Sequence, residues 1–368
     1  MGRKIGKVMF HLNSLGKGGA ERVVSLLANE FVKDGVEVII ATEWYSKEEY
    51  KLEAGVKRVH AGLSQRQEKA SRIAKQWYRI HNLRKVLLKE KPDVLLSFCV
   101  KANYRAMMAA TGSSIPVITS VRNDPKIDYA GRINSFMNKL FLNRADGCVF
   151  QTEEAKSFFD TTLQKKAIII CNPVNEKYLK AKRKTPEKKI VTVGRLSTQK
   201  NQMLLVKAFE KLLEKYPDYT LCLYGEESDD GCKGKLIQYV TKKELKDKIH
   251  FMGLSSTLET DLADAVMFVL SSDYEGMPNA LMEAMALGLP VISTNCPCGG
   301  SRYWIDHGKT GQLVPVRDVN AMAEAMEYYI QNPERAADMG EQAKERLQEA
   351  SLDKIFEKWK NYIKKTVE

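Results

Sequence analysis

Short apolar runs rich in β-branched residues alternate along the chain with longer segments whose apolar residues recur every three or four positions. In the first half these runs predict strands at 7–12, 36–42, 94–98, 117–121, 147–151 and 167–171. Between the first two runs, apolar residues from Ala20 to Phe31 follow the spacing of a helix. Strands that alternate with helices are typical of parallel sheets built from β-α-β units.

The rhythm stops at Asn172-Pro173-Val174 and a lysine-rich stretch, and then restarts. Further strands are predicted at 190–193, 220–224, 248–252, 266–270 and 291–294, with helices from Asn201 and at 233–245. We therefore predict an α/β protein of two Rossmann-like, doubly wound parallel-sheet domains, residues 1–175 and 176–350. Residues 351–368 are expected to form a helix that packs back on the first domain. Ligands of such sheets bind at the carboxyl ends of the strands, so a cleft between the domains is the expected site.

Length and composition agree with two globular domains. The chain has 368 residues, of which 44% are hydrophobic and 28% charged. No segment approaches the roughly 20 apolar residues that a membrane span needs, and residues 1–10 show no signal-peptide pattern, so a cytoplasmic location is expected. The seven scattered cysteines fit a reducing compartment. The one close pair, Cys296-Pro-Cys298, lacks a second pair for zinc and is interpreted as a loop beside the site.

Positive charge is concentrated in the first half of the chain. Residues 1–180 hold 31 Lys and Arg against 18 Asp and Glu, a net charge of +13, whereas the remaining 188 residues hold 27 against 28. Such asymmetry indicates an anionic partner for one domain only. Nucleic acid and anionic lipid both satisfy this requirement on composition alone.

Two loops are candidates for binding an anion. Gly16-Lys17-Gly18-Gly19-Ala20-Glu21 joins the first strand to the first helix, where glycines permit close approach and helix N–H groups favour negative charge. A tight turn alone would also explain it. Gly194-Arg195 and Lys200-Asn201 follow the first strand of the second half, and both cations are expected to reach one phosphate group. The alternative is a pair of solvated surface cations.

The third motif runs from Asp273 to Pro290 and contains two carboxylates, Glu275 and Glu283, eight positions apart. Glu275 ends a predicted strand on a glycine turn, and Glu283 lies in an otherwise apolar helix that begins near Pro278 or Asn279. A carboxylate in such surroundings is costly to bury unless hydroxyl or cationic groups meet it, and sugar hydroxyls would do so. The N–H groups of residues 276–279 offer a further cradle.

Together these motifs resemble glycosyltransferase family 4, which consists of retaining enzymes with the two-domain GT-B fold. The resemblance rests on Gly18-Gly19-Ala20-Glu21, Asn172-Pro173-Val174, Gly194-Arg195 with Lys200-Asn201, and the pair Glu275 and Glu283. Many members carry a histidine where this chain has Arg122-Asn123-Asp124-Pro125. That variant is similar to bacterial exopolysaccharide enzymes, including amylovoran-type galactosyltransferases.

The resemblance implies roles for particular residues. Arg195 and Lys200 would bind the donor diphosphate and act in catalysis with Glu275, which contacts the donor sugar, while Glu283 binds the ribose. Further donor contacts are expected from the residues of two other loops and the turn before the helix: Gly18, Gly19, Met252, Gly253, Gly276, Met277, Pro278 and Asn279. Arg122 and Asn123 would face the acceptor or the reacting sugar. The implied donor is a UDP-sugar, and the transferred sugar would be galactose, N-acetylgalactosamine, N-acetylglucosamine or glucose.

The sequence also predicts that no metal or cofactor is needed. Arg195, Lys200 and a helix N-terminus bring charge comparable to one divalent ion to the departing diphosphate. No Asp-x-Asp motif is present, and Asp273-x-Glu275 alone makes no octahedral site.

Residues 65–91 predict a helix with Lys69, Arg72, Lys75 and Arg79 along one stripe. Apolar residues beside this stripe include Ile73, Trp77, Ile80 and Leu87. A basic band next to an aromatic band suits anionic lipid head groups, although a core-facing helix with solvated cations would show the same pattern.

The expected partners are therefore a nucleotide-sugar donor, a lipid-linked saccharide acceptor and the inner face of an anionic membrane, to which the protein binds peripherally; no nucleic acid is expected. Two other functions fit the motifs: a nucleotide-sugar hydrolase or epimerase of GT-B fold, and a non-catalytic subunit that binds lipid or RNA through its basic domain.

Overall fold

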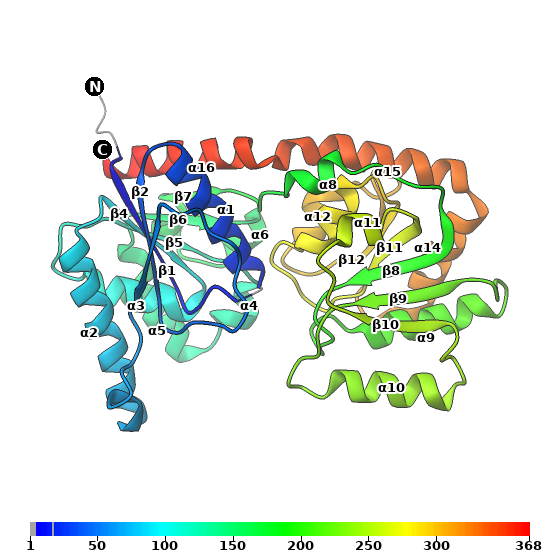
Figure 1. Ribbon diagram of the computed structural model, residues 1–368, viewed down its shortest axis with the longest axis horizontal. Coiled ribbons are helices and arrows are strands. Elements are labelled where there is room, and N and C mark those ends of the chain that lie inside the picture. The colour runs from blue at the N-terminus through cyan, green and yellow to red at the C-terminus, as the bar shows by residue number, and fades with distance from the viewer. Residues whose placement is uncertain (1–4, 17) are drawn as a thin grey trace. The chain divides into compact units, whose positions relative to one another are not determined.

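The computed structural model describes residues 5–16 and 18–368. Residues 1–4 and Lys17, part of the predicted glycine loop, lie outside the described residues. The chain divides into two compact units (Figure 1): unit 1 comprises Met1–Pro173 and Leu352–Glu368, and unit 2 comprises Val174–Ser351. Each unit contains one parallel sheet with helices on both faces, which confirms the predicted α/β class.

The sheet of unit 1 has seven strands in the order β3-β2-β1-β4-β5-β6-β7, and all neighbours are parallel. Its strands are β1 (Lys7–Leu12), β2 (Glu37–Thr42), β3 (Val56–His60), β4 (Val94–Phe98), β5 (Val117–Ser120), β6 (Gly147–Phe150) and β7 (Ala167–Ile169). The central strands are fully buried because helices cover both faces. The order reverses between β1 and β4, which is where ligands bind in doubly wound sheets.

The helices of unit 1 are α1 (Gly19–Lys33), α2 (Arg72–Glu90), α3 (Val100–Ala110), α4 (Pro125–Asp128), α5 (Arg132–Leu140), α6 (Glu153–Ser157), α7 (Thr161–Gln164) and α16 (Leu352–Val367), with 3₁₀ turns η1 (Gln67–Lys69) and η2 (Leu142–Arg144). Right-handed crossovers place α1 and α3 on opposite faces, since the strand order runs in opposite directions after β1 and β4. The helix predicted at 65–91 is shorter than expected, because α2 begins only at Arg72 and residues 67–69 form the separate 3₁₀ turn η1.

The C-terminal helix α16 belongs to unit 1 and completes its core. The ring of Phe356 meets that of Phe31 on α1 edge-on at 4.8 Å, and the fully buried Trp359 stacks on Phe98 at 5.6 Å. Tyr362 accepts a hydrogen bond from the backbone N–H of Cys148 on β6 (2.8 Å). Helix α16 is strongly amphipathic, and these contacts bury its apolar side.

The sheet of unit 2 has six parallel strands in the order β10-β9-β8-β11-β12-β13. They are β8 (Glu187–Val193), β9 (Thr220–Tyr224), β10 (Ile249–Gly253), β11 (Ala265–Leu270), β12 (Val291–Thr294) and β13 (Gln312–Val314). The helices are α8 (Glu176–Lys180), α9 (Gln202–Leu213), α10 (Cys232–Lys242), α11 (Leu258–Asp261), α12 (Asn279–Ala286), α13 (Gly300–Trp304), α14 (Val319–Gln331) and α15 (Pro333–Leu347), with the 3₁₀ turn η3 (Gln348–Ala350). The reversal point lies between β8 and β11, and the helices that follow these two strands, α9 and α12, leave to opposite faces.

Candidate active site

The loops at the reversal point of unit 2 carry six of the fourteen predicted site residues, including the three proposed to act in catalysis. Residues 194–201 follow β8, and residues 271–278 follow β11. Because β8 and β11 are neighbours and parallel, their carboxyl ends lie at one edge of the sheet. The predicted residues Arg195, Lys200 and Glu275 all belong to these two loops, so the structure brings their loops together.

Two glycines let the loop after β8 pack closely on the loop after β9. Gly194 has φ +155° and Gly225 has φ +143°, and a Cβ atom on Gly225 would lie 2.1 Å from the carbonyl oxygen of Gly194. The loops are joined by the N–H of Leu196, which donates to the carbonyl of Glu226 (2.7 Å). A side chain at 225 would break this contact and displace the segment that carries Arg195 and Lys200.

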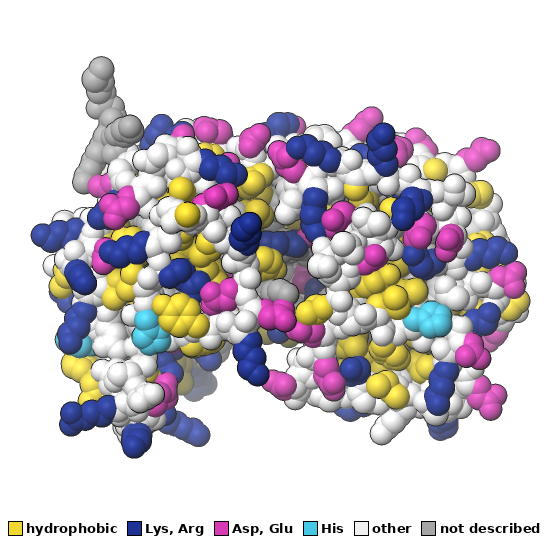
Figure 2. Space-filling model, viewed as in Figure 1, with side chains coloured by type: hydrophobic (Ala, Val, Ile, Leu, Met, Phe, Trp, Pro, Cys, Tyr) yellow, Lys and Arg dark blue, Asp and Glu magenta, His cyan; other side chains and the backbone are white. Residues whose placement is uncertain are grey.

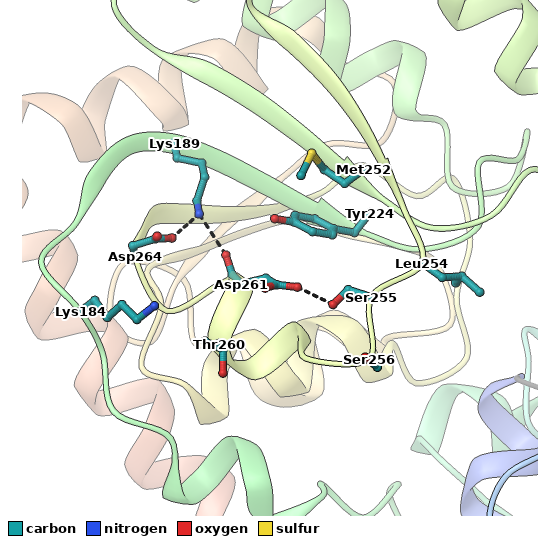
Figure 3. A pocket seen from close by; sticks show the side chains of 10 residues that line it. All are labelled: Lys184, Lys189, Tyr224, Met252, Leu254, Ser255, Ser256, Thr260, Asp261 and Asp264. Carbon is teal, nitrogen blue, oxygen red and sulfur yellow. Dashed lines mark hydrogen bonds and ion pairs between the residues drawn. The ribbon is translucent and has the colours of Figure 1, made fainter.

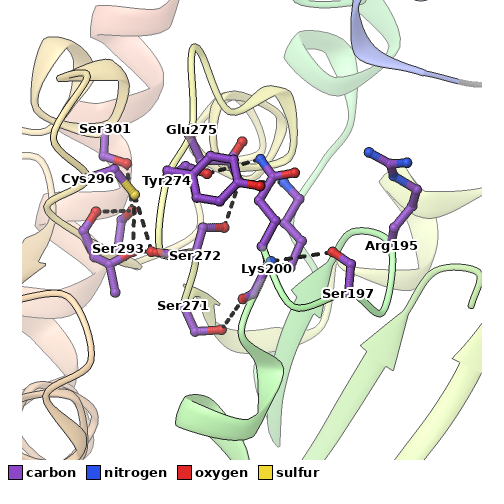
Figure 4. A network of polar contacts seen from close by, with 12 residues as sticks. Arg195, Ser197, Lys200, Ser271, Ser272, Tyr274, Glu275, Ser293, Cys296 and Ser301 are labelled. Atoms are coloured by element: carbon purple, nitrogen blue, oxygen red, sulfur yellow. Dashed lines mark hydrogen bonds and ion pairs between the residues drawn. The ribbon is translucent and has the colours of Figure 1, made fainter. Parts of the chain in front are cut away.

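Lys200 and Glu275 form an ion pair at the centre of the site (Figure 4). Lys200 Nζ lies 2.6 Å from Glu275 Oε1, and the hydroxyl of Ser272 donates to the same oxygen at 2.6 Å. Only 6% of Glu275 is exposed. A carboxylate buried to this extent is costly unless it is paired and hydrogen-bonded. The two partners therefore satisfy the buried Glu275 side chain and fix its orientation.

Lys200 lies in the turn before α9, which begins one residue after the predicted start at Asn201. Asn201 is the N-cap residue, has φ 45°, and its side-chain oxygen accepts from the N–H of Leu204 (3.3 Å). Asparagine tolerates this left-handed conformation better than most residues. The cap turns the chain so that the Lys200 side chain extends from the sheet edge towards Glu275.

Asp273, the first residue of the third motif, joins the two loops, a structural role that the sequence did not indicate. Its carboxylate accepts from Asn201 Nδ2 (2.8 Å) and from Arg317 Nε and Nη2 (2.9 and 2.7 Å). The pairing raises the pKa of the Arg317 guanidinium, mainly through the hydrogen bond. In addition, the N–H of Asp273 donates to the carbonyl of Gln199 (2.9 Å). Both carboxylate oxygens of Asp273 are thus used to hold the loop.

Arg195 is exposed beside this pair. Its carbonyl accepts from Gln202 Nε2 (2.8 Å), which anchors its backbone. Within the described part of the chain, its guanidinium makes no hydrogen bond or ion pair, and Figure 4 shows it apart from Lys200 and Glu275. An exposed guanidinium on the same loop as a lysine is available to bind an anion in a bidentate manner.

Helix α12 begins at Asn279, as predicted, and carries the buried Glu283, which is 4% exposed. The turn before it packs against the start of α13, since a Cβ atom on Gly300 would lie 1.9 Å from the carbonyl oxygen of Gly276. Met277 is buried, and its sulfur accepts from the indole N–H of Trp304 (3.1 Å). Of the predicted donor contacts in this turn, Met277 can thus offer its backbone, while its side chain supports the fold.

The loop after β12 supports the same region from behind. Thr294 Oγ1 and Cys296 Sγ both donate to the carbonyl of Ser272 (2.6 and 3.2 Å). Burial raises the pKa of the Cys296 thiol to about 12, so the thiol stays protonated. Both Cys296 and Cys298 are buried. Across residues 5–16 and 18–368, no three His, Cys, Asp or Glu side chains gather closely enough to hold a metal ion.

Met252 and Gly253, predicted to lie near the nucleobase, stand at the end of β10 next to a cavity of about 510 Å³ (Figure 3). Tyr224 and Leu254 contribute apolar surface to it, and Ser255 and Asp261, which share a hydrogen bond, contribute polar groups. Gly253 has φ +69° and adopts the left-handed conformation that directs the chain around the rim.

In unit 1 the described part of the glycine loop opens α1. Gly18 is its N-cap residue and donates from its N–H to the carbonyl of Gly16 (2.7 Å), and Gly19 begins the helix. A Cβ atom on Gly18 would lie 2.2 Å from the Glu21 carboxylate. The loop therefore follows β1 at the reversal point of the first sheet, as predicted for a ligand-binding turn.

Arg122 and Asn123 follow β5, but their side chains engage different partners. Arg122 is buried against the ring of Phe98 and donates from Nη2 to Asn172 Oδ1 (2.5 Å). Burial lowers the pKa of its guanidinium to about 10, which still leaves it charged at neutral pH. Asn123 instead donates to Asp128 Oδ1 (3.2 Å). The structure thus places Arg122 against the linker residue Asn172, a contact that sequence reasoning missed.

Comparison with known proteins identifies both halves of the chain. Residues 17–178 match Glycosyltransferase Family 4, and residues 174–346 match Glycosyl transferases group 1. The chain is 29% identical to an uncharacterised glycosyltransferase of Methanocaldococcus jannaschii over 246 residues, 60% of each protein.

A second relative covers nearly the whole chain. It is the Campylobacter jejuni enzyme named GalNAc-α-(1→4)-GalNAc-α-(1→3)-diNAcBac-PP-undecaprenol α-1,4-N-acetyl-D-galactosaminyltransferase, which is 25% identical over 97% of this chain and 98% of its own. Among solved structures, Anabaena HepE in complex with UDP superposes with a TM-score of 0.78 at 16% identity, covering 96% of this chain and 98% of that one.

The two matches together span residues 17–346, and the fold of two doubly wound parallel sheets is that of the solved relatives. The chain therefore belongs to the family 4 glycosyltransferases of the GT-B fold.

Proposed function

We propose that this chain is a retaining hexosyltransferase that moves a sugar from a UDP-sugar to a lipid-linked saccharide during the synthesis of a cell-surface polysaccharide. Galactose, N-acetylgalactosamine, N-acetylglucosamine and glucose are the candidate sugars. The observation that carries the proposal is the ion pair between the partly buried Lys200 and the buried Glu275, with the exposed Arg195 on the same loop as Lys200, at the carboxyl edge of the second sheet. Two cations and one fixed carboxylate suit a ligand that has an anionic diphosphate and a hydroxyl-bearing sugar.

The cations would act on the leaving group. Breaking the bond between the anomeric carbon and the diphosphate leaves negative charge on the phosphate oxygens. Lys200 has three N–H donors and directs one to Glu275, so the others remain for phosphate. Arg195 adds a second positive charge, and the N-terminus of α12 adds roughly half a charge more. Donors aimed at developing charge are usually the largest catalytic contribution.

The reaction would proceed on one face of the donor sugar, so that the anomeric configuration is retained. The departing phosphate oxygen takes the proton of the acceptor hydroxyl, which attacks from the same face. Glu275 orients the sugar and supports its positive charge electrostatically. Its Oε1 is already held by Lys200 and Ser272, which favours a role as a fixed anion over attack on the sugar.

The rest of the donor would extend along the same edge. Glu283 would bind the ribose, the backbone of residues 276–279 would contact the sugar, and the loop of Met252 and Gly253 would contact the base beside the cavity in Figure 3. Gly18 and Gly19 of unit 1 would approach the donor diphosphate through their backbone. Arg195 and Lys200 would supply charge comparable to a divalent ion, so we propose that transfer needs no metal.

The acceptor side is proposed for unit 1. This unit holds 34 Lys and Arg against 20 Asp and Glu, whereas unit 2 holds 24 against 26. The basic excess fits the anionic inner face of a membrane, where a lipid-linked acceptor would reside, and the Campylobacter relative is named for such an acceptor. Ile73 and Trp77 on α2 are exposed, which favours lipid contact over a core-facing helix. Among the described helices, none is both long and apolar enough to cross a membrane, so the contact proposed is peripheral.

The proposal is tested by a donor screen in EDTA. Purified protein is given each UDP-hexose with and without a diphosphate-lipid-linked saccharide, and UDP release and the anomeric form of the product are measured. We expect one donor to support release that requires the acceptor, persists in EDTA and gives a product of retained configuration. Glu275→Gln should lower kcat about 100-fold, while Glu226→Gln, an exposed neighbour on the next loop, should not.

Three results would contradict parts of this proposal. Equal UDP release without acceptor would identify a hydrolase. Activity that is lost in EDTA and restored by magnesium would refute the metal-free mechanism. A covalent adduct between the sugar and Glu275 would replace the proposed single-face transfer by a two-step reaction.

A further inference from the structure

Helix α5 of unit 1 exposes the apolar residues that a helix of a globular protein normally buries. Ile133 is 80% exposed and Phe136 63% exposed, and the neighbouring Ile127 of α4 is also exposed. Monomeric proteins rarely place several large apolar side chains on one short exposed segment without an interaction partner. This segment, residues 125–144, is called the α4–α5 segment below.

The only buried residue of α5 is polar, whereas the apolar Met137 and Leu140 are only partly buried, so we call the helix inverted with respect to the usual pattern. Asn138 is buried and accepts a hydrogen bond from the hydroxyl of Tyr104 on α3 (2.6 Å). Asn134, one turn earlier, donates to the carbonyls of Asp128 and Ala130 (3.2 and 2.9 Å). These specific contacts fix the orientation of the helix. The outward position of Ile133 and Phe136 is therefore set by the fold.

Positive charge accompanies the exposed apolar residues. The α4–α5 segment holds Lys126, Arg132, Lys139 and Arg144, and Asp128 is its only acidic residue. Arg132, Phe136 and Lys139 are spaced three or four positions apart, so they share one face of α5. Asp128 lies on α4, is partly buried and accepts a hydrogen bond from Asn123 (3.2 Å).

Helix α2 presents a matching surface on the other side of α3. Arg105 of α3 donates to Gln76 of α2 (3.1 Å), and the preceding residue, Tyr104, contacts α5. Trp77 follows Gln76 and is 58% exposed, so exposed apolar side chains stand on two helices that contact adjacent residues of α3. Figure 2 shows Lys and Arg side chains with hydrophobic side chains between them on the surface over α2, at the lower left.

Two of the cations predicted along α2 are already paired. Arg79 binds the buried Glu43, and Lys75 binds Glu68. The outward charge of this surface comes instead from exposed residues such as Arg72 and Lys69, together with the cations of the α4–α5 segment. Basic side chains that surround exposed aromatic and aliphatic groups complement anionic lipid head groups above an acyl-chain boundary.

We propose that the α4–α5 segment and the first half of α2 form one membrane-docking surface, which inserts Ile133, Phe136 and Trp77 between the head groups of an anionic bilayer. The inference rests on the proposed action at a membrane, and it assigns the contact to a second, inverted helix. An amphipathic helix of this kind lies in the plane of the interface, with its apolar side chains directed into the lipid.

The test is flotation with phosphatidylcholine vesicles that contain or lack phosphatidylglycerol. The wild-type protein should bind vesicles containing phosphatidylglycerol, and the double variant Ile133→Ser/Phe136→Ser should bind them about tenfold more weakly. Ile237→Ser is the matched control, because Ile237 is 44% exposed on α10 of unit 2; it should bind as the wild type does. Equal binding by the double variant and the wild type would overturn the proposal.

A conservative variant gives a second measurement that does not depend on loss of binding. Phe136→Trp should show an additional blue-shifted fluorescence when vesicles with phosphatidylglycerol are added, relative to the wild type. No added shift, despite vesicle binding, would overturn insertion of α5. If the double variant binds vesicles normally but loses turnover with the lipid-linked acceptor, α5 holds the acceptor chain and the docking proposal is wrong.

The outcome is separable from that of the proposed function. Vesicle binding that depends on Phe136 without UDP release from any donor would reject the transferase and leave the docking surface standing. If transfer proceeds and the double variant still binds vesicles normally, the docking surface is rejected and the proposed transferase stands.

Discussion

Lys200 and Glu275 each fix the position of the other's charged group. The lysine pairs with the buried carboxylate, and the carboxylate directs the ammonium group to the edge of the sheet where a phosphate would arrive. A buried ion pair is weak evidence for stability, because desolvation offsets much of the attraction. The position of the Lys200–Glu275 pair at the reversal point is better explained by ligand binding, since Ser272 holds Glu275 and the cap at Asn201 directs Lys200.

Sequence reasoning found the charged residues at this edge but not the groups that position them. Glu275 and Glu283 are conspicuous because they interrupt an apolar run. Arg317, by contrast, reaches Asp273 across 44 positions of the chain, and no local pattern indicates such a contact. Likewise, the contact of Arg122 with Asn172 depends on tertiary packing alone.

A buried histidine in unit 1 gives a prediction about pH and stability. His11 is fully buried on β1 and donates from Nδ1 to the carbonyl of Ala41 (3.1 Å). Burial lowers its pKa from 6.5 to about 4, and nearby Arg105 contributes in the same direction. Between pH 4 and 6.5, His11 is protonated in the unfolded chain but neutral in the folded chain. The free energy of unfolding should therefore decrease by about 3 kcal/mol as the pH falls from 6.5 to 4.

The measurement is urea unfolding across this pH range for the wild type and His11→Asn. Asparagine preserves a donor for the carbonyl of Ala41 and does not titrate, so the variant should lose this part of the pH dependence. An identical loss of stability in both proteins would show that His11 is not its source.

At the scale of elements, patterning located the interior strands, but among the longer helices it missed α3, α14 and α15. Strands β3 and β13 were not predicted. Both are edge strands: β3 has no continuous buried run, and β13 has three residues. Edge strands bury fewer side chains and so leave a weaker signal. The inverted packing of α5 could not be predicted from the sequence either, because periodicity shows that a helix has two faces but not which of them is buried.

The glycine at the end of β9 provides a prediction for the loops of the site. Gly225→Ala should destabilise the protein by about 2 kcal/mol or more, because its Cβ atom would meet the carbonyl of Gly194 at 2.1 Å and its φ is +143°. Since the displaced segment carries Arg195, UDP affinity should fall as well. Urea unfolding and UDP titration measure the two effects.

Gly234→Ala is the matched control, because this glycine lies within α10 and its Cβ atom would have no neighbour within 4 Å. Alanine there should preserve or slightly raise stability. If Gly225→Ala were as stable as the control and bound UDP normally, the close packing of the two loops would not be what positions the cations.

For the whole molecule, the sequence predicted the fold class and the uneven charge. The doubly wound order of both sheets follows from alternating strands and helices, since right-handed crossovers leave few other arrangements. The excess of positive charge lies in unit 1, while the carboxylates of the proposed donor site lie in unit 2. This division agrees with one unit for the membrane and acceptor and another for the sugar nucleotide, the arrangement that the proposed function requires.

Calorimetric titration with UDP and UMP in EDTA tests the central claim, that Arg195 and Lys200 bind the donor diphosphate. The wild type should bind UDP about tenfold or more tightly than UMP, because the second phosphate meets both cations. Arg195→Met and Lys200→Met should each weaken UDP binding about 10-fold to 100-fold and UMP binding much less. Lys235→Met, an exposed control on α10, should bind as the wild type does. If Arg195→Met and Lys200→Met bound UDP as tightly as the wild type, the diphosphate would not lie at this edge and the proposed chemistry would be wrong.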